Sequence, residues 1–142
     1  MDFLGLIGEL HLPMLGLTAL VILYSDHQGF EYFRGKKQTL SPTFIHWAHI
    51  LAWVGLVGMI ITGAALLIPR WEFMLQRPDF YVKMGFVGVL IVNGFAIGKL
   101  SRVAAERPFT LLSSEERQTL MLSGFLSATG WIGAAAIGYF FL

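Results

Sequence analysis

Four long apolar stretches dominate the chain, and short polar segments separate them. They cover residues 3–24, 44–68, 80–100 and 120–142. A helix needs about 20 apolar residues to cross the hydrocarbon core of a membrane, and each stretch meets that length. A transmembrane β-barrel would instead show shorter spans in which polar and apolar residues alternate. The pattern therefore predicts an all-α protein, an up-down bundle of four transmembrane helices forming one domain over residues 1–142.

Residues typical of helix boundaries stand at the edges of these stretches: Ser41-Pro42, Pro78-Asp79, the capping-box pair Ser113 and Glu116, and Gly35. Serine before proline is an N-cap followed by the residue that best tolerates the first helical position. A glycine after the first stretch is typical of a helix C-terminus. With these signals we expect spans of about 3–34, 42–68, 79–104 and 114–142.

Composition agrees with a membrane protein. Only 13 % of residues are charged and 56 % are hydrophobic, whereas a soluble domain carries about 25 % charged residues. The net charge of +1 gives no reason to expect a nucleic-acid partner. The chain has no cysteine, which excludes disulfides, thiolate metal sites and iron–sulfur clusters.

Basic residues are distributed unevenly between the two ends of the predicted bundle. Seven belong to the first and third connections and two to the second: Arg34, Lys36, Lys37, Lys99, Arg102, Arg107 and Arg117, against Arg70 and Arg77. Cytoplasmic loops carry an excess of lysine and arginine. We therefore expect the first and third connections in the cytoplasm and both termini outside.

Three of the four histidines and one glutamate fall near the cytoplasmic ends of the first two helices: His27, His46, His49 and Glu31. If the two helices are levelled at their shared turn, His27 and His49 each lie eight residues, or about 12 Å, from it. His46 is one turn from His49, and Glu31 is one turn from His27, with Asp26 nearby.

This cluster has three interpretations. Two level histidines on neighbouring helices can ligate the iron of haem b from both faces, which makes His27 and His49 candidate cofactor ligands. Together with His46 and Glu31 they can instead hold Zn²⁺ or another divalent metal. The third interpretation is a cluster of polar side chains that hydrogen-bond one another near the lipid headgroups.

Other polar residues lie within the spans. Glu9 and His11 on the first helix and Lys83 on the third enter from the outer side, and an ion pair of Glu9 with Lys83 would lower the cost of inserting both. The alternative is a proton or ion pathway through them. Near mid-bilayer, Asn93 is expected to hydrogen-bond between helices, as are Ser127 and Thr129.

Several short motifs carry a resemblance to a known family: Leu10-His11-Leu12, Ser25-Asp26, Trp53-Val54-Gly55-Leu56, Thr62-Gly63, and Phe80-Tyr81-Val82-Lys83-Met84 followed by Asn93-Gly94. In these the chain resembles small four-helix bacterial membrane proteins of the broad copper-resistance-D-like kind. The resemblance implies a place in the inner (cytoplasmic) membrane of a bacterium. The resemblance spans most of the chain and implies a connection with copper handling or with haem-bearing membrane helices. It matches Lys83 and Asn93-Gly94 to family positions, whereas His46 and His49 lie outside its pattern.

Three functions fit these observations. The first is a haem b-binding electron-transfer or accessory subunit of a membrane complex, the second a component of a metal-ion or proton transporter or channel, and the third a purely structural membrane subunit. The sequence has no glycine-rich phosphate loop, no H-E-x-x-H and no G-x-S-x-G, so an independent enzyme is not expected. The expected partners are membrane lipid and either other membrane subunits or a second copy of the chain, since small-residue stripes such as Gly94 with Gly98 permit close helix packing.

Overall fold

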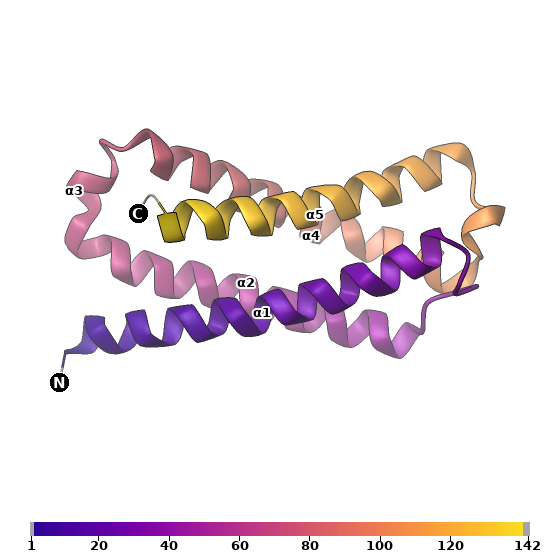
Figure 1. Ribbon diagram of the computed structural model, residues 1–142, viewed down its shortest axis with the longest axis horizontal. Helices are drawn as coiled ribbons and strands as arrows, with labels where there is room; N and C mark the ends of the chain where they lie inside the picture. Colours follow the sequence, from indigo (N-terminus) through magenta and orange to yellow (C-terminus); the bar gives the residue numbers. More distant parts are fainter. Residues whose placement is uncertain (1, 141–142) are drawn as a thin grey trace.

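The computed structural model describes residues 2–140, which form four long α-helices (Figure 1). Their bounds are α1 Phe3–Phe33, α2 Pro42–Leu67, α4 Pro78–Glu106 and α5 Ser114–Phe140. The short helices η1 (Ile68–Arg70) and α3 (Trp71–Met74) continue α2, and η2 (Phe109–Leu111) precedes α5. All four long helices have the length and apolar composition needed to cross a membrane. The predicted all-α bundle of four transmembrane helices is confirmed, with residues 141–142 of the last predicted span outside the described residues.

The helix boundaries follow local chemistry, as predicted. The Ser41 side chain caps α2 by accepting from the Phe44 N–H. Before α5, the Glu116 N–H donates to Ser113 Oγ and the Ser113 N–H donates to Glu116 Oε1, both at 3.1 Å, which is a complete capping box. Gly35, just beyond α1, has a φ of 78°, a left-handed conformation that favours glycine.

The helices form two antiparallel hairpins, α1 with α2 and α4 with α5. Contacts between the hairpins, α2 with α4 and α1 with α5, are less extensive than contacts within them. Both ends of the chain lie at one end of the bundle, and the first and third connections lie at the other (Figure 1). We call these the terminal end and the loop end. Because α1 neighbours α2 and α5, it lies diagonally across the bundle from α4.

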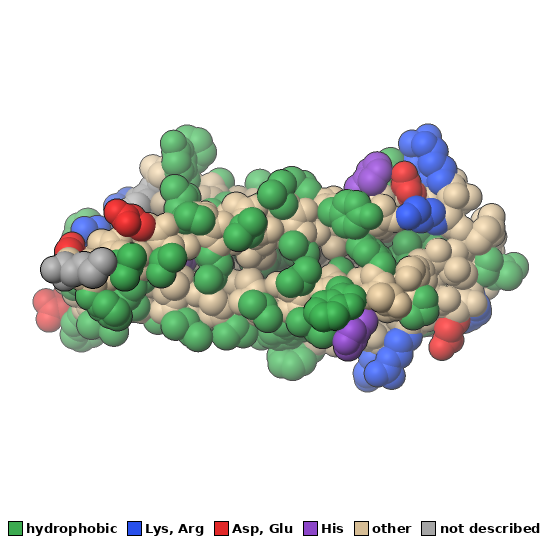
Figure 2. Space-filling view, turned by 90° about the horizontal axis from the view of Figure 1, so that it is seen from below, with side chains coloured by type: hydrophobic (Ala, Val, Ile, Leu, Met, Phe, Trp, Pro, Cys, Tyr) green, Lys and Arg blue, Asp and Glu red, His purple; other side chains and the backbone are tan. Residues whose placement is uncertain are grey.

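The outer surface is apolar along the middle of the bundle. Figure 2 shows hydrophobic side chains along the length of one face, with the charged and histidine side chains gathered toward the two ends. Large apolar side chains such as Val92 and Phe95 are 70 % and 73 % exposed. By contrast, several polar side chains are buried inside the bundle, including Asn93 and Ser123. This distribution suits a protein whose solvent along the bundle is lipid.

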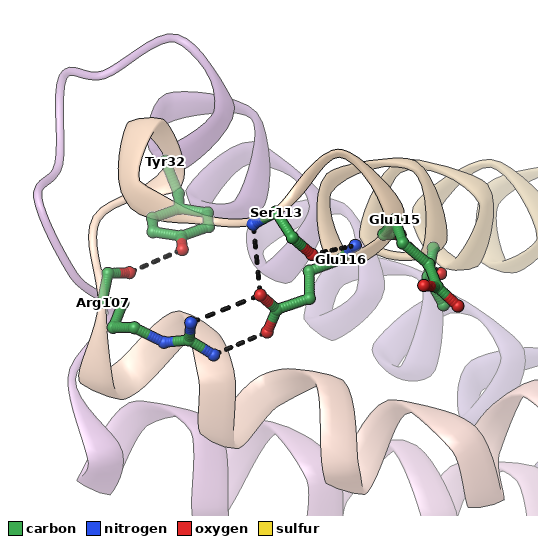
Figure 3. Close-up of polar contacts among 6 residues, drawn as sticks. Tyr32, Arg107, Ser113, Glu115 and Glu116 are labelled. Carbon is green, nitrogen blue, oxygen red and sulfur yellow. Dashed lines mark hydrogen bonds and ion pairs between the residues drawn. The ribbon is translucent and has the colours of Figure 1, made fainter.

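The two hairpins are tied together at the loop end. Tyr32 is buried in an apolar cluster with Ala104, Leu112 and Leu120, and so joins α1 to the second hairpin. Its hydroxyl donates to the Arg107 carbonyl at 2.7 Å, as Figure 3 shows. The Leu40 N–H donates to the Ala104 carbonyl at 3.0 Å. Packing and hydrogen bonds therefore fix how the hairpins meet at this end.

Candidate functional site

A cavity of about 340 Å³ lies between the two hairpins, in the half of the bundle nearer the loop end. All four long helices contribute to its walls, which are mostly apolar and include the indole rings of Trp53 and Trp131. Its lining also includes a small set of polar side chains: Ser25, Asp26, His49, Asn93, Ser101, Ser123 and Ser127. Mostly apolar walls with a few polar groups are typical of small-molecule sites.

Small residues create this space. Gly29 on α1 and Gly124 on α5 line the cavity, and a Cβ atom added at either would meet nothing within 4 Å. Ala48 and Ala52 line it from α2. The small residues of α2 thus have two roles. Ala48 and Ala52 leave room for the cavity, whereas Gly55 lets α2 pack directly against Thr18 of α1.

Asp26 is the one carboxylate of the lining. It lies about two turns before the end of α1. Within residues 2–140 its side chain has no hydrogen-bond or ion-pair partner, although it is half-buried. An ionisable side chain in a membrane-spanning helix usually faces a partner or a cavity, and Asp26 lines the cavity.

The structure separates the predicted pair of haem ligands. His49 lines the cavity, with its ring edge-on to Trp53 at 6.4 Å between centroids. His27 does not line it: its side chain is 63 % exposed, and Nε2 lies 3.2 Å from Glu31 Oε1. Ligation of haem b by both histidines does not fit this arrangement. The turn sets the depth of both residues, but the rotation of each helix about its axis points the two rings in different directions.

The predicted metal cluster is also not assembled. His46 is exposed on the surface beside Trp47, with 6.0 Å between ring centroids. Glu31 contacts His27 at 3.2 Å and Lys37 at 3.9 Å. In the part of the chain that the structure describes, no group of three or more His, Asp or Glu side chains could hold a metal ion. The one-turn spacing aligned these residues in height, yet they do not converge on one point.

Asn93 makes the interhelical hydrogen bonds expected of it, with a partner that the sequence did not reveal. Its Nδ2 donates to the Ser123 carbonyl at 3.1 Å, and the Ser123 hydroxyl donates to Asn93 Oδ1 at 2.7 Å. Both side chains are buried. Ser123 is one turn from Ser127, so the serine repeat on α5 was the available signal. The pair ties α4 to α5 where both helices line the cavity.

The polar residues near the terminal end are arranged differently from the prediction. Glu9 is exposed and is not ion-paired with Lys83 among the described side chains. The reason is that α1 and α4 are diagonal in the bundle. Lys83 instead approaches α5, where a Cβ at Gly138 would lie 2.9 Å from its Nζ. His11 Nδ1 lies 2.5 Å from Thr62 Oγ1 on α2.

The Thr62 hydroxyl donates to the Gly58 carbonyl at 2.7 Å, so its oxygen is free to accept from the His11 Nδ1–H. This bond supports the α1–α2 hairpin, and His11 does not line the cavity at the loop end. The terminal-end residues therefore form a separate polar layer.

Comparison of the chain with protein-family models, with curated proteins and with solved structures finds no match. The resemblance to the copper-resistance-D-like proteins stays a prediction.

Proposed function

We propose that this chain is a multi-pass membrane subunit that takes up an amphipathic small molecule from the bilayer and holds it between its two helix hairpins. The observation that carries the proposal is the cavity, which combines apolar walls with the unpartnered carboxylate of Asp26. Small-molecule sites usually have volumes of about 300–1,000 Å³ and bury most of the ligand against apolar walls. The cavity of about 340 Å³ falls within that range.

The route into the cavity supports a ligand that comes from lipid. Phe30 on α1 and Phe125 on α5 line the cavity, yet they are 55 % and 65 % exposed. Side chains that face both the cavity and the outside mark the place where the two are continuous. Phe30 lies on α1 toward the loop end, beside Arg34, and Phe125 lies within the apolar stretch of α5. A ligand entering there needs an apolar body to leave the bilayer sideways.

Haem b is a second candidate, and His49 is the observation in its favour. A single imidazole can hold haem iron from one side, and His49 is the histidine that lines the cavity. A bound haem would make the chain an electron-transfer subunit. Visible absorption of the purified protein tests this form directly: a Soret band that shifts on reduction and disappears in His49→Ala supports it, and colourless protein overturns it.

The proposal is tested by filling the cavity without disturbing the backbone. Gly29→Leu and Gly124→Leu place a side chain into the open space of the lining. Gly16→Leu and Gly88→Leu are matched controls, because their Cβ positions are equally open and they lie outside the lining. Protein purified in a mild detergent is extracted with solvent, and the extract is analysed by mass spectrometry.

We expect the parent and both controls to retain a small molecule that is enriched over bulk lipid and that both cavity-filling variants lose. Identical extracts from all five proteins would overturn ligand binding and favour a purely structural subunit.

We also propose the orientation that the basic residues indicate, with the loop end in the cytoplasm and both termini outside a bacterial inner membrane. The seven-to-two distribution of basic residues between the connections supports it. Reporter domains fused at the C-terminus and inserted at Gln38 test it. A reporter active in the cytoplasm from the C-terminus would contradict the orientation.

A further inference from the structure

None of the described basic side chains near the end of α1 forms an ion pair with Asp26. His27 and Lys37 both approach Glu31, at 3.2 Å and 3.9 Å. The Arg34 guanidinium stacks over the Phe30 ring, 5.4 Å from its centroid. Glu31 and Phe30 therefore contact three of the nearby basic side chains, and the Asp26 carboxylate has no ion-pair partner among the described residues.

The rest of the cavity supplies no positive charge for Asp26 either. The lining contains two other titratable side chains, His49 and Tyr32. His49 is not within ion-pair distance of Asp26, and the Tyr32 hydroxyl donates to the Arg107 carbonyl. Asn93 and Ser123 satisfy each other. Among the polar side chains of the lining that remain for a ligand, Asp26 is the one acidic group.

A carboxylate surrounded by apolar walls is stabilised by a cation or by a proton, and destabilised by a second anion. A ligand with an ammonium head would supply both the charge and N–H donors for the Asp26 oxygens. Its apolar tail would lie against the walls that Trp53 and Trp131 help to form. Ligands with carboxylate or phosphate heads would bring like charge to the same place.

We propose that the cavity selects amphipathic amines, whose positively charged head pairs with Asp26 while the apolar tail fills the space between the hairpins. This inference rests on the proposed function and specifies its ligand class. It assigns Asp26 as the residue that determines specificity.

The native tryptophans provide a test. Trp53 and Trp131 line the cavity, whereas Trp47 and Trp71 are 58 % and 54 % exposed on the outside. In a Trp47→Phe, Trp71→Phe background, tryptophan fluorescence comes from the two cavity-lining residues, Trp53 and Trp131. The reciprocal Trp53→Phe, Trp131→Phe protein reports on the surrounding lipid or detergent.

Three probes share a decyl chain carrying a nitroxide quencher and differ only in the head: primary amine, hydroxyl or carboxylate. In the cavity-reporting protein we expect the amine probe to reach half-maximal quenching at a concentration about tenfold or more below that of the hydroxyl probe, as a specific ion pair requires. The carboxylate probe should quench least. In the reciprocal protein we expect the three heads to quench alike.

Asp26→Asn should remove the preference for the amine and leave quenching by the hydroxyl probe in place. Glu31→Gln is the matched control: it removes a carboxylate from the same helix that lies outside the lining, and it should keep the preference. The comparison of the three probe heads in the protein that keeps Asp26 tests the proposal even if Asp26→Asn does not fold.

Two failures are distinguishable. If all three probes quench the cavity tryptophans equally, or Asp26→Asn keeps the preference, the choice of amines is overturned although the cavity still takes a ligand. A second outcome is that every probe quenches Trp53 and Trp131 no more strongly in the cavity-reporting protein than in the same protein with Gly124→Leu. That result would overturn uptake of a ligand, and the proposed function would fail with it.

Discussion

Two glycines within the second hairpin and two glycines that line the cavity between the hairpins have opposite surroundings. Within the second hairpin, a Cβ at Gly130 would lie 2.7 Å from Leu90, and one at Gly133 would lie 2.7 Å from Phe86. Between the hairpins, Gly29 and Gly124 have open space where a Cβ would stand. Glycine therefore lets α4 and α5 approach closely within the second hairpin, and it leaves open space between the hairpins.

The bundle is therefore closely packed within each hairpin and less filled between the hairpins, where we propose that a ligand binds. Helices in lipid associate through close packing and interhelical hydrogen bonds, because burial of apolar surface gives little gain there. Each hairpin has such packing, whereas the interface between hairpins relies on the Tyr32 cluster at the loop end and on Trp53 against Gly94 nearer the middle. We therefore regard the hairpins as two firm units with a less filled interface between them.

The largest expected effect comes from valine at Gly130. Gly130→Val forces the side chain against Leu90 and should lower the free energy of unfolding by about 1–3 kcal/mol, as overpacking does. Gly124→Val on the same helix points into the cavity and should cost clearly less. Unfolding in mixed micelles with increasing denaturing detergent measures both. Equal losses would break the contrast between tight hairpins and an open interface.

Asn93→Ala should have the next largest effect, because it removes both hydrogen bonds to Ser123 within the second hairpin. Interhelical hydrogen bonds in membrane proteins contribute about 0.6 kcal/mol on average and up to about 1.7 kcal/mol. Ser123→Ala should cost less, since its backbone carbonyl still accepts. The same unfolding assay applies, and an Asn93→Ala protein as stable as the parent would contradict this role.

Tyr32→Phe sharpens the comparison from the other side, because it weakens the tie between hairpins and leaves each hairpin intact. Loss of the hydroxyl bond to the Arg107 carbonyl should cost about 0.5–1.5 kcal/mol. The chain has no native cysteine, so spin labels can be attached to cysteines introduced at Gln38 and Thr110. We expect a broader distance distribution between these labels than in the parent; an unchanged distribution would show that Tyr32 does not hold the hairpins together.

The smallest effect is expected at the Arg107–Glu116 ion pair, shown in Figure 3. Its contacts are 3.3 Å and 2.6 Å, but the two side chains are 45 % and 29 % exposed. Arg107→Ala should therefore cost at most about 1 kcal/mol, and less at high salt. Glu116→Ala should cost more, because it also breaks the capping box. If Arg107→Ala lowers the free energy of unfolding more than Glu116→Ala does, the ion pair contributes more to stability than we expect.

The sequence predicted the helices well because their determinants are local. Ser41-Pro42 and the Ser113–Glu116 pair act within one turn, and the structure begins α2 and α5 where they predict. The side-chain pairings were harder, since depth along a helix does not fix direction around it. His27 and His49 were placed at one level, yet only His49 lines the cavity.

The sequence also did not show which helices lie next to each other in the bundle. The Glu9–Lys83 prediction treated α1 and α4 as adjacent, whereas the two hairpins place them diagonally. Asn93 was recognised as an interhelical donor, but its partner Ser123 depended on how α4 and α5 align. The cavity depends on the rotation of all four helices about their axes and on which helices are neighbours. No pattern within a single helix could therefore predict it.

The most direct test of the central claim is an experimental structure of the chain in lipid nanodiscs, compared with that of Gly124→Leu. We expect two closely packed hairpins with elongated non-protein density between them, one end beside Asp26 and the other between Trp53 and Trp131. In Gly124→Leu that density should be absent while each hairpin keeps its packing. Hairpins that close together and fill the space with their own side chains would contradict ligand binding between the hairpins.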